Sequence, residues 1–205
     1  MEQSFLHGFV LALGLILPLG AQNVFVFSQG VVQPTIARAL PAVLVAAVSD
    51  TILILIAVGG VSLLVLSLDW VRYVLVGIGV VFLSYMGWLT WSTGGFGKEL
   101  QGTDGQWTVK RQILFAASVS IFNPHAILDT IGVIGTSSLA YTGINKASFT
   151  LSCVIVSWLW FFGLAILGRY LRSAQGAAAI LPVFNRISAI IMWGCGIYLA
   201  FDLFK

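Results

Sequence analysis

The sequence predicts an all-α polytopic membrane protein, with six transmembrane helices arranged as two inverted three-helix repeats. Three observations carry this prediction: scarce charge, six long apolar runs and a weak repeat at half the chain length. Only 8% of the 205 residues are charged and 59% are hydrophobic, whereas about 25% are charged in ordinary soluble domains. These values exclude a soluble enzyme and a disordered chain. The absence of a Lys/Arg cluster that could follow phosphates excludes a nucleic-acid partner.

Six apolar runs are each long enough to cross a hydrocarbon core of about 30 Å, which takes about 20 helical residues. They are residues 4–28, 39–66, 70–92, 112–138, 148–171 and 183–204. The connections between them are too short for a second folded domain, so we expect one membrane domain over residues 1–205. Its two repeats, 1–92 and 112–205, flank a cytoplasmic loop at 93–111. Because Glu2 stands where a signal peptide would be basic, we expect the first run to be a span.

The internal repeat pairs features that lie about 106 to 113 residues apart. Pro18 in the first run is echoed by Pro124 in the fourth, and the segment at Asp50 is echoed by that at Ser157. With three spans per half, the two halves would be inverted with respect to the membrane. Inverted repeats with interrupted helices are typical of transporters. Chance similarity between apolar helices is the alternative.

The basic residues indicate an orientation, because cytoplasmic loops are enriched in Lys and Arg. In the six-span model, seven basic residues fall on one side and three on the other, which places both termini outside the cytoplasm. A five-span model, with one run lying in the interface, would place the termini on opposite sides. The larger set is Arg38, Lys98, Lys110, Arg111, Arg169, Arg172 and Arg186, and the smaller set is Arg72, Lys146 and Lys205.

Two acidic residues lie deep in the apolar runs, Asp50 in the second and Asp129 in the fourth. An ionisable group near the bilayer centre costs at least about 2.5–3.5 kcal/mol on insertion scales, so each is a candidate functional residue. The alternative is an aspartate that pairs with a polar neighbour and locks helix packing. No basic residue lies at comparable depth. If both are ionised, the counter-charge comes from a proton, an ion or a cationic substrate.

The fourth run contains a signal for a helix that restarts inside the membrane. Asn123 is a favoured N-cap, and Pro124 suits the first helical position, where its missing N–H group is not needed. The positive N-terminal end of such a half-helix suits a carboxylate. His125 and Asp129 are four residues apart, so they lie on one helix face and could share a proton. A satisfied core histidine is the alternative for His125.

The first run has a matching interruption. Pro18 removes a helical hydrogen bond, and Gly20 loosens the backbone after it. The amides of Gln22 and Asn23 are expensive against lipid, so we expect them to face protein or a wet cavity. A plain proline kink with packed amides is the alternative.

Other residues give little support for further chemistry. Cys153 and Cys195 have neither CxxC nor metal-ligand spacing, so they are interpreted as small core residues, and no metal or cofactor is expected. A thiol electron-transfer protein is therefore disfavoured. An intramembrane aspartyl protease would bring Asp50 and Asp129 together to share one proton. Ile127 and Leu128 precede Asp129 instead of the Gly-x-Gly of such proteases, which disfavours this alternative.

The sequence resembles the lysine/arginine exporter (LysE/ArgO) family of bacterial inner-membrane carriers over nearly the whole chain. Residues 17–24 and 29–30 resemble the family's PxGPQN…QG segment, 48–50 its SD segment, and 122–130 its LNPxxxLD segment. Residues 157–163 are similar to the arginine-exporter branch. All three motifs occur in the family's order.

The chain departs from the family pattern at two motif positions. Ala21 stands where the family usually has proline, which should make the first break milder, and Phe122 stands where leucine is common. The resemblance implies a non-enzymatic exporter of cationic amino acids in the bacterial inner membrane. Related groups carry neutral amino acids or metal ions, so export of a neutral amino acid or a divalent metal is the alternative.

Together these features suggest proton-coupled export of L-arginine, L-lysine or both. Asp50 or Asp129 would hold the substrate's guanidinium or ammonium group. Its carboxylate would meet the half-helix that starts at Pro124 and the amides of Gln22 and Asn123. The expected partners are these amino acids, protons and the lipid bilayer, and a homo-oligomer remains open.

Overall fold

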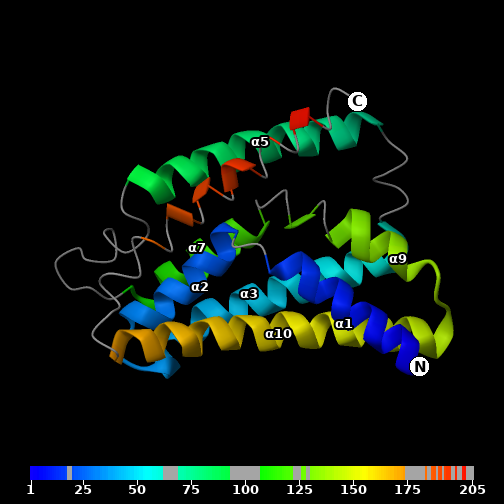
Figure 1. Cartoon of the computed structure of the whole chain (residues 1–205), viewed down its shortest axis with the longest axis horizontal. Coiled ribbons are helices and arrows are strands. Elements are labelled where there is room, and N and C mark those ends of the chain that lie inside the picture. Colours follow the sequence, from blue (N-terminus) through cyan, green and yellow to red (C-terminus); the bar gives the residue numbers. More distant parts are fainter. Residues whose placement is uncertain are drawn as a thin grey trace.

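The computed structural model describes residues 1–17, 20–61, 69–92, 107–121, 126–127 and 130–173, with short helical stretches between 183 and 201. Within this part of the chain the fold is all-helical and contains no strand (Figure 1). The helices are α1 Glu2–Ile16, α2 Ala21–Val32, α3 Ile36–Ile56, α5 Asp69–Ser92, α7 Val109–Ile121, α9 Thr136–Ser138 and α10 Gly143–Ser173. Two π-helical turns interrupt them, η1 Ala57–Val61 and η2 Thr130–Gly135.

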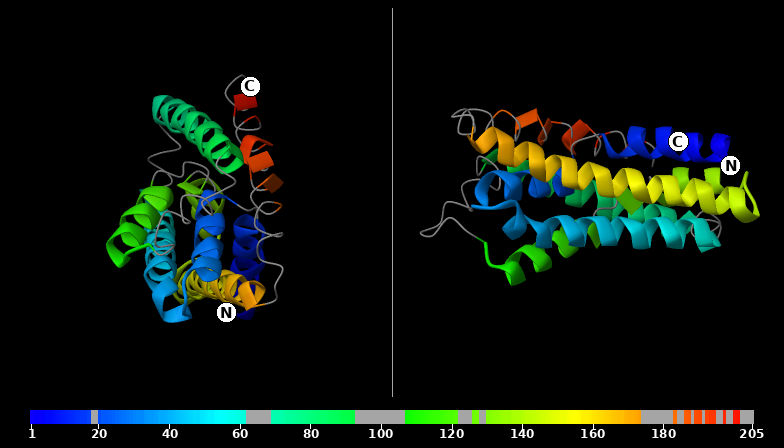
Figure 2. Two further views of the ribbon diagram at one scale, coloured as in Figure 1. Left: turned by 90° about the vertical axis from the view of Figure 1, so that its left-hand side faces the viewer. Right: turned by 90° about the horizontal axis from the view of Figure 1, so that it is seen from below.

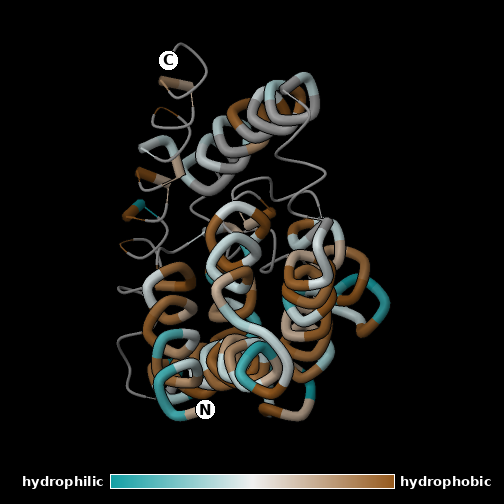
Figure 3. The backbone as a smooth tube through the Cα atoms, turned by 90° about the vertical axis from the view of Figure 1, so that its right-hand side faces the viewer, coloured by the Kyte–Doolittle hydropathy of each residue, from teal (hydrophilic) through white to brown (hydrophobic). Residues whose placement is uncertain are grey.

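Two helical segments are long and apolar enough to cross a membrane, Ile36–Gly60 and Gly143–Arg172. Apolar residues dominate the bundle when it is seen end-on (Figure 3). Helices α1 and α2 pass the same test as one span, bent by 80° at the break between them. This pair reaches Val32, four residues beyond the end expected from the sequence.

The two prolines to which we assign the breaks, Pro18 and Pro124, lie outside the described residues. The break between α1 and α2 falls between Ile16 and Ala21, which brackets Pro18. The assignment of both breaks to prolines, the six spans and the inverted repeat therefore stay predictions.

Helices α1 and α2 follow α10 in the same direction along its length. A Cβ atom added to Gly8 of α1 would meet Ser152, and one added to Gly30 of α2 would meet Ala165 further along α10. The two helices thus form a bent path whose outer ends lie on α10 (Figure 1). The bend lifts the start of α2 towards the middle of the bundle.

Helix α3 runs antiparallel to α10 and parallel to α7. Near one end of the bundle, Val43 belongs to the same apolar cluster as Leu164, and near the other end Ile54 clusters with Cys153. The amide of Gln112 on α7 donates to the Arg38 carbonyl at the start of α3 (3.0 Å). These directions are the ones that alternating first, second, fourth and fifth spans require.

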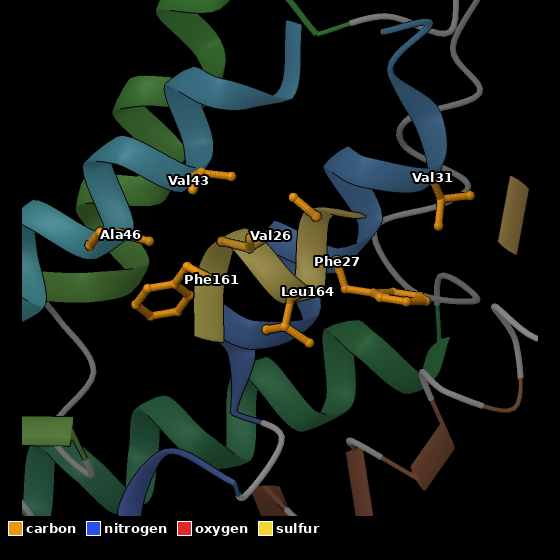
Figure 4. Close-up of a cluster of buried hydrophobic side chains, with 9 residues drawn as sticks. Val26, Phe27, Val31, Val43, Ala46, Phe161 and Leu164 are labelled. Carbon is orange, nitrogen blue, oxygen red and sulfur yellow. The ribbon is translucent and has the colours of Figure 1, made fainter. Parts of the chain in front are cut away.

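The core lies where α2, α3 and α10 meet (Figure 4). Small side chains let the helices approach closely, and the larger ones interlock between them. The buried members of this cluster are Val26, Phe27, Val31, Val43, Ala46, Ala47, Phe161, Leu164 and Ala165. The packing fixes how α2 and α3 face each other.

Helix α3 ends in an irregular turn that contacts a second one. Gly60 has φ of 104°, a left-handed conformation that favours glycine, within η1. Turn η1 packs against η2, which continues the fourth apolar run. Such π-helical turns occur frequently at functional sites, and here η1 lies about two to three turns beyond Asp50 along the chain.

Five basic residues gather at one end of the bundle, where α2 and α10 end and α3 and α7 begin (Figures 1 and 2). We call this the basic end. Contacts tie it together: Arg172 donates to the Gln33 carbonyl (2.8 Å), and Gln112 donates to the Arg38 carbonyl. The five residues are Arg38, Lys110, Arg111, Arg169 and Arg172. All five belong to the set that the sequence analysis placed in the cytoplasm.

Helix α5 lies on the far side of the bundle from α10, beside the described C-terminal stretches (Figure 2). The indole N–H of Trp193 donates to the Ser84 carbonyl (3.3 Å), and Trp193 covers Gly87. The third and sixth apolar runs therefore contact each other.

Candidate functional site

Asp50 lies near the middle of the most apolar described helix. At 1.5 Å per residue, it is about 21 Å along a segment of about 37 Å that runs from Ile36 to Gly60. Its side chain faces α2 and α10 and is half-buried. A carboxylate at this depth is costly unless its oxygens are hydrogen-bonded.

Both oxygens of the Asp50 carboxylate accept hydrogen bonds from neutral side chains. The hydroxyl of Ser157 on α10 donates to Oδ2 at 2.8 Å. The amide of Gln22 on α2 donates to Oδ1 at 3.4 Å and to the Ala46 carbonyl, also at 3.4 Å. Because the bond to Oδ1 is the longer of the two, this oxygen is available to a better donor. With neutral donors, an ionised Asp50 keeps its full negative charge.

The first turn of α2 places Gln22 and Asn23 beside the break. Asn23 donates to the Ile16 carbonyl at 2.9 Å, so its amide caps the end of α1 across the gap. Such carbonyls have no partner within their own helix. Both amides are buried, each 6% exposed, and face protein as the sequence analysis expected.

The bend also brings a helix N-terminus to the level of Asp50. Gly20 precedes α2 in an extended conformation (φ −70°, ψ 173°), and the helix begins at Ala21, next to Gln22. The first N–H groups of a helix point along its axis and carry partial positive charge. The start of α2 and the Asp50 carboxylate are linked through the Gln22 side chain.

Ser157 is a site residue that the sequence motifs do not single out. The repeat was the signal that could have found it. Asp50 and Ser157 are 107 residues apart, and so are Thr51 and Trp158, whose indole N–H donates to the Thr51 hydroxyl at 3.0 Å. The repeat read from the sequence pairs Ser49–Asp50 with Ser157–Trp158, one residue away from these contacts, so it indicated the segment of α10 and not the individual residue.

Four of the expected site residues, Asn123, Pro124, His125 and Asp129, lie outside the described residues, as does Pro18. The structure therefore brings Asp50, Gln22, Asn23 and Gly20 into one region without testing the other half of the site. Outside this region, His7 pairs with the Tyr141 hydroxyl (2.8 Å) near the start of α1, which fits a structural role. Among the described residues, no group of three His, Cys, Asp or Glu side chains could hold a metal ion.

A bundle of long apolar helices with a hydrogen-bonded carboxylate beside an interrupted helix has the features of a multi-pass membrane transporter. The chain belongs to the LysE type translocator family, whose model matches residues 13–203. The resemblance drawn from the sequence motifs is thereby confirmed. No solved structure matches the chain.

Full-length relatives support this membership. The chain is 49% identical over 201 residues to a Bacillus subtilis (strain 168) protein named "Putative amino-acid transporter YisU", covering 98% of this chain and 90% of that protein. It is 33% identical over 210 residues to the arginine exporter protein ArgO of Enterobacter sp. (strain 638), covering 100% and 95%. The ArgO protein of Escherichia coli O157:H7 is 32% identical over 207 residues, covering 98% and 95%.

Proposed function

We propose that this protein exports the cationic amino acids L-arginine, L-lysine or both across the bacterial cytoplasmic membrane, in exchange for protons. The observation that carries the proposal is the Asp50 carboxylate, which lies deep in an apolar helix with neutral donors and beside the start of α2. Family membership and the arginine exporters among the relatives support an amino-acid cargo.

The site offers complementary ends to an amino-acid cation. The guanidinium or ammonium group would bind the Asp50 carboxylate and displace the 3.4 Å contact from Gln22. A guanidinium offers paired donors in a planar fork, so it gains more from a carboxylate than a neutral side chain would. The substrate's carboxylate would lie at the N-terminus of α2, near Gln22 and Asn23.

Asp129, Asn123, Pro124 and His125 complete the proposal in the second half of the chain. In an inverted repeat, the half-helix beginning at Pro124 would oppose α2 and present a second N-terminus to the substrate. Asp129, with His125 one turn away, would supply the second proton-binding group. Rocking of one three-helix half against the other would then expose the site to each side in turn.

Proton exchange removes an electrical cost. Moving one positive charge out against an inside-negative potential costs about 2.3 kcal/mol per 100 mV. If Asp50 holds either a proton or the cationic group, but not both, each outward cation is matched by an inward proton and no net charge moves. The basic end would face the cytoplasm, in agreement with the excess of Lys and Arg there.

Counterflow in proteoliposomes tests the proposed substrate. Vesicles loaded with unlabelled arginine are expected to accumulate labelled arginine, and external lysine or a guanidinium analogue should compete. Neutral amino acids and divalent metals should not compete. Competition by threonine or by a divalent metal, with none by lysine, would replace the cationic substrate by one of those cargoes.

Ser157 is expected to position the Asp50 carboxylate. Its hydroxyl forms the shorter of the two hydrogen bonds to that group, and a hydrogen bond to a charged partner contributes about 1.5–3 kcal/mol. Ser157→Ala should therefore weaken arginine transport by about tenfold, mainly through KM. Ser157→Thr retains the hydroxyl and should recover most of the loss. If alanine and threonine variants transport equally well, the hydroxyl has no such role.

A further inference from the structure

Three buried glutamine side chains recur along α2 and its C-cap, between the Asp50 site and the basic end. Gln22, Gln29 and the C-cap Gln33 are spaced by seven and four residues, which at 100° per residue places them within about 40° of one another around the helix. The apolar side chains of Phe25 and Val26 lie between Gln22 and Gln29. The exposed fractions of the three glutamines are 6%, 0% and 1%. A helix packed for stability alone would bury apolar side chains there, as α2 does on the face shown in Figure 4.

At the basic end, the side-chain amides of Gln33 and Gln112 cluster around the backbone carbonyl of Trp107. The Gln33 amide donates to the Gln29 side-chain oxygen at 3.1 Å and to the Trp107 carbonyl at 3.3 Å. The amide of Gln112, at the start of α7, donates to the same Trp107 carbonyl at 3.1 Å and to that of Arg38 at 3.0 Å. Three helices are thus held together by weak, exchangeable contacts.

The cluster is incompletely satisfied. Among the described residues, neither the Gln29 side-chain nitrogen nor the Gln112 side-chain oxygen finds a hydrogen-bond partner, and both atoms are buried. A buried polar atom without a partner costs free energy that an apolar residue of the same shape would not. The Gln29 nitrogen and the Gln112 oxygen are therefore available to other partners in another state.

Arginine contacts and a cavity lie on the outer side of the cluster. Arg172 donates to the Val32 carbonyl at 2.7 Å and to that of Gln33 at 2.8 Å, which ties the end of α2 to α10. On the α7 side, a cavity of about 430 Å³ lies against Trp107 and Arg111.

We propose that Gln29, Gln33 and Gln112 form the inner gate of the transporter and line the polar half of the substrate path, closed in this structure. The inference rests on the proposed function and deepens it. When α7 moves away from α2, the amide groups lose the Trp107 carbonyl and can hydrogen-bond both the carboxylate and the cationic groups of an amino acid. Because these amide groups are neutral, they would bind the charged substrate only weakly and would release it readily.

Cysteine accessibility tests the gate. In a background carrying Cys153→Ala and Cys195→Ala, Gln29→Cys is compared with Val31→Cys, which lies at similar depth on α2 but faces the apolar cluster with α10. A membrane-impermeant thiol reagent is applied to either side of native-membrane vesicles. Labelling of Gln29→Cys from the basic-end side, at least about tenfold faster than of Val31→Cys, is the expected result. Equal resistance of both, or labelling from the opposite side alone, would overturn the gate.

An isosteric variant separates a gate from a structural contact. Gln29→Met removes the amide but keeps the shape, so the thermal unfolding midpoint should be unchanged or higher, while arginine efflux falls by at least fivefold. Wild-type efflux with a lowered unfolding midpoint would show a merely structural role and contradict the gate. If the wild type exports no arginine, the proposed substrate fails, and the cysteine comparison still decides the gate.

Discussion

Replacing Asp50 by asparagine is expected to reduce proton-driven arginine efflux from loaded vesicles by at least about tenfold. The change is isosteric and retains an oxygen for the Ser157 hydroxyl, so the helix packing around it should persist. The variant loses only the negative charge that would bind the substrate's cationic group. A hydrogen bond to a charged group contributes about 1.5–3 kcal/mol, which corresponds to a factor of about ten or more in affinity. Residual transport should no longer depend on the pH gradient.

Two further variants accompany this experiment, one as a control and one as a test of the second carboxylate. Glu2→Gln removes an exposed acidic residue in the first turn of α1, far from the site, and should leave efflux unchanged. Asp129→Asn tests the second carboxylate and should also lower efflux. Unchanged, pH-dependent efflux in both the Asp50 and Asp129 variants would show that neither carboxylate couples the substrate to protons.

Gly30→Ala is expected to destabilise the bundle. A Cβ atom at this position would overlap the backbone carbonyl of Ala165, and Gly168 makes a similar close approach to the Phe27 carbonyl. Because both obstacles are backbone atoms, α2 must move away from α10, and overpacking of this kind costs about 1–3 kcal/mol. The thermal unfolding midpoint of the detergent-solubilised protein should fall by several degrees.

A matched glycine on the same interface partner provides the control. Gly163 of α10 has open space around its Cβ position, and alanine is favoured over glycine inside a helix by about 0.5–1 kcal/mol. Gly163→Ala should therefore unfold at the same or a higher temperature. A lower midpoint in both variants would mean that the close α2–α10 contact does not account for the effect at Gly30.

Features set by local chemistry were accessible from the sequence. The expected span at 148–171 corresponds to α10, and the expected start of α5 at residue 70 is within one residue of the observed one. The cost of a carboxylate in an apolar run singled out Asp50, and the cost of amides against lipid singled out Gln22 and Asn23. These costs hold whatever the neighbouring helices are.

Features set by tertiary packing were harder to find. Gln33 precedes Pro34 and lies beyond the first apolar run, yet its side chain is 1% exposed because Trp107, just before α7, packs against it. Ser157 is an ordinary polar residue until α10 crosses α3 at Asp50. A single apolar pattern does not record which helix lies opposite, so the donors to Asp50 and the amide cluster could not be predicted from it.

The most direct test of the account follows protons and arginine together. Proteoliposomes that contain the protein and a trapped pH-sensitive dye are given arginine outside, with no other gradient. If inward arginine is exchanged for outward protons, the lumen should become alkaline in the wild type, and Asp50→Asn should abolish the change. Arginine uptake without a change in lumenal pH, or the same alkalinisation in the Asp50→Asn variant, would contradict proton exchange at Asp50.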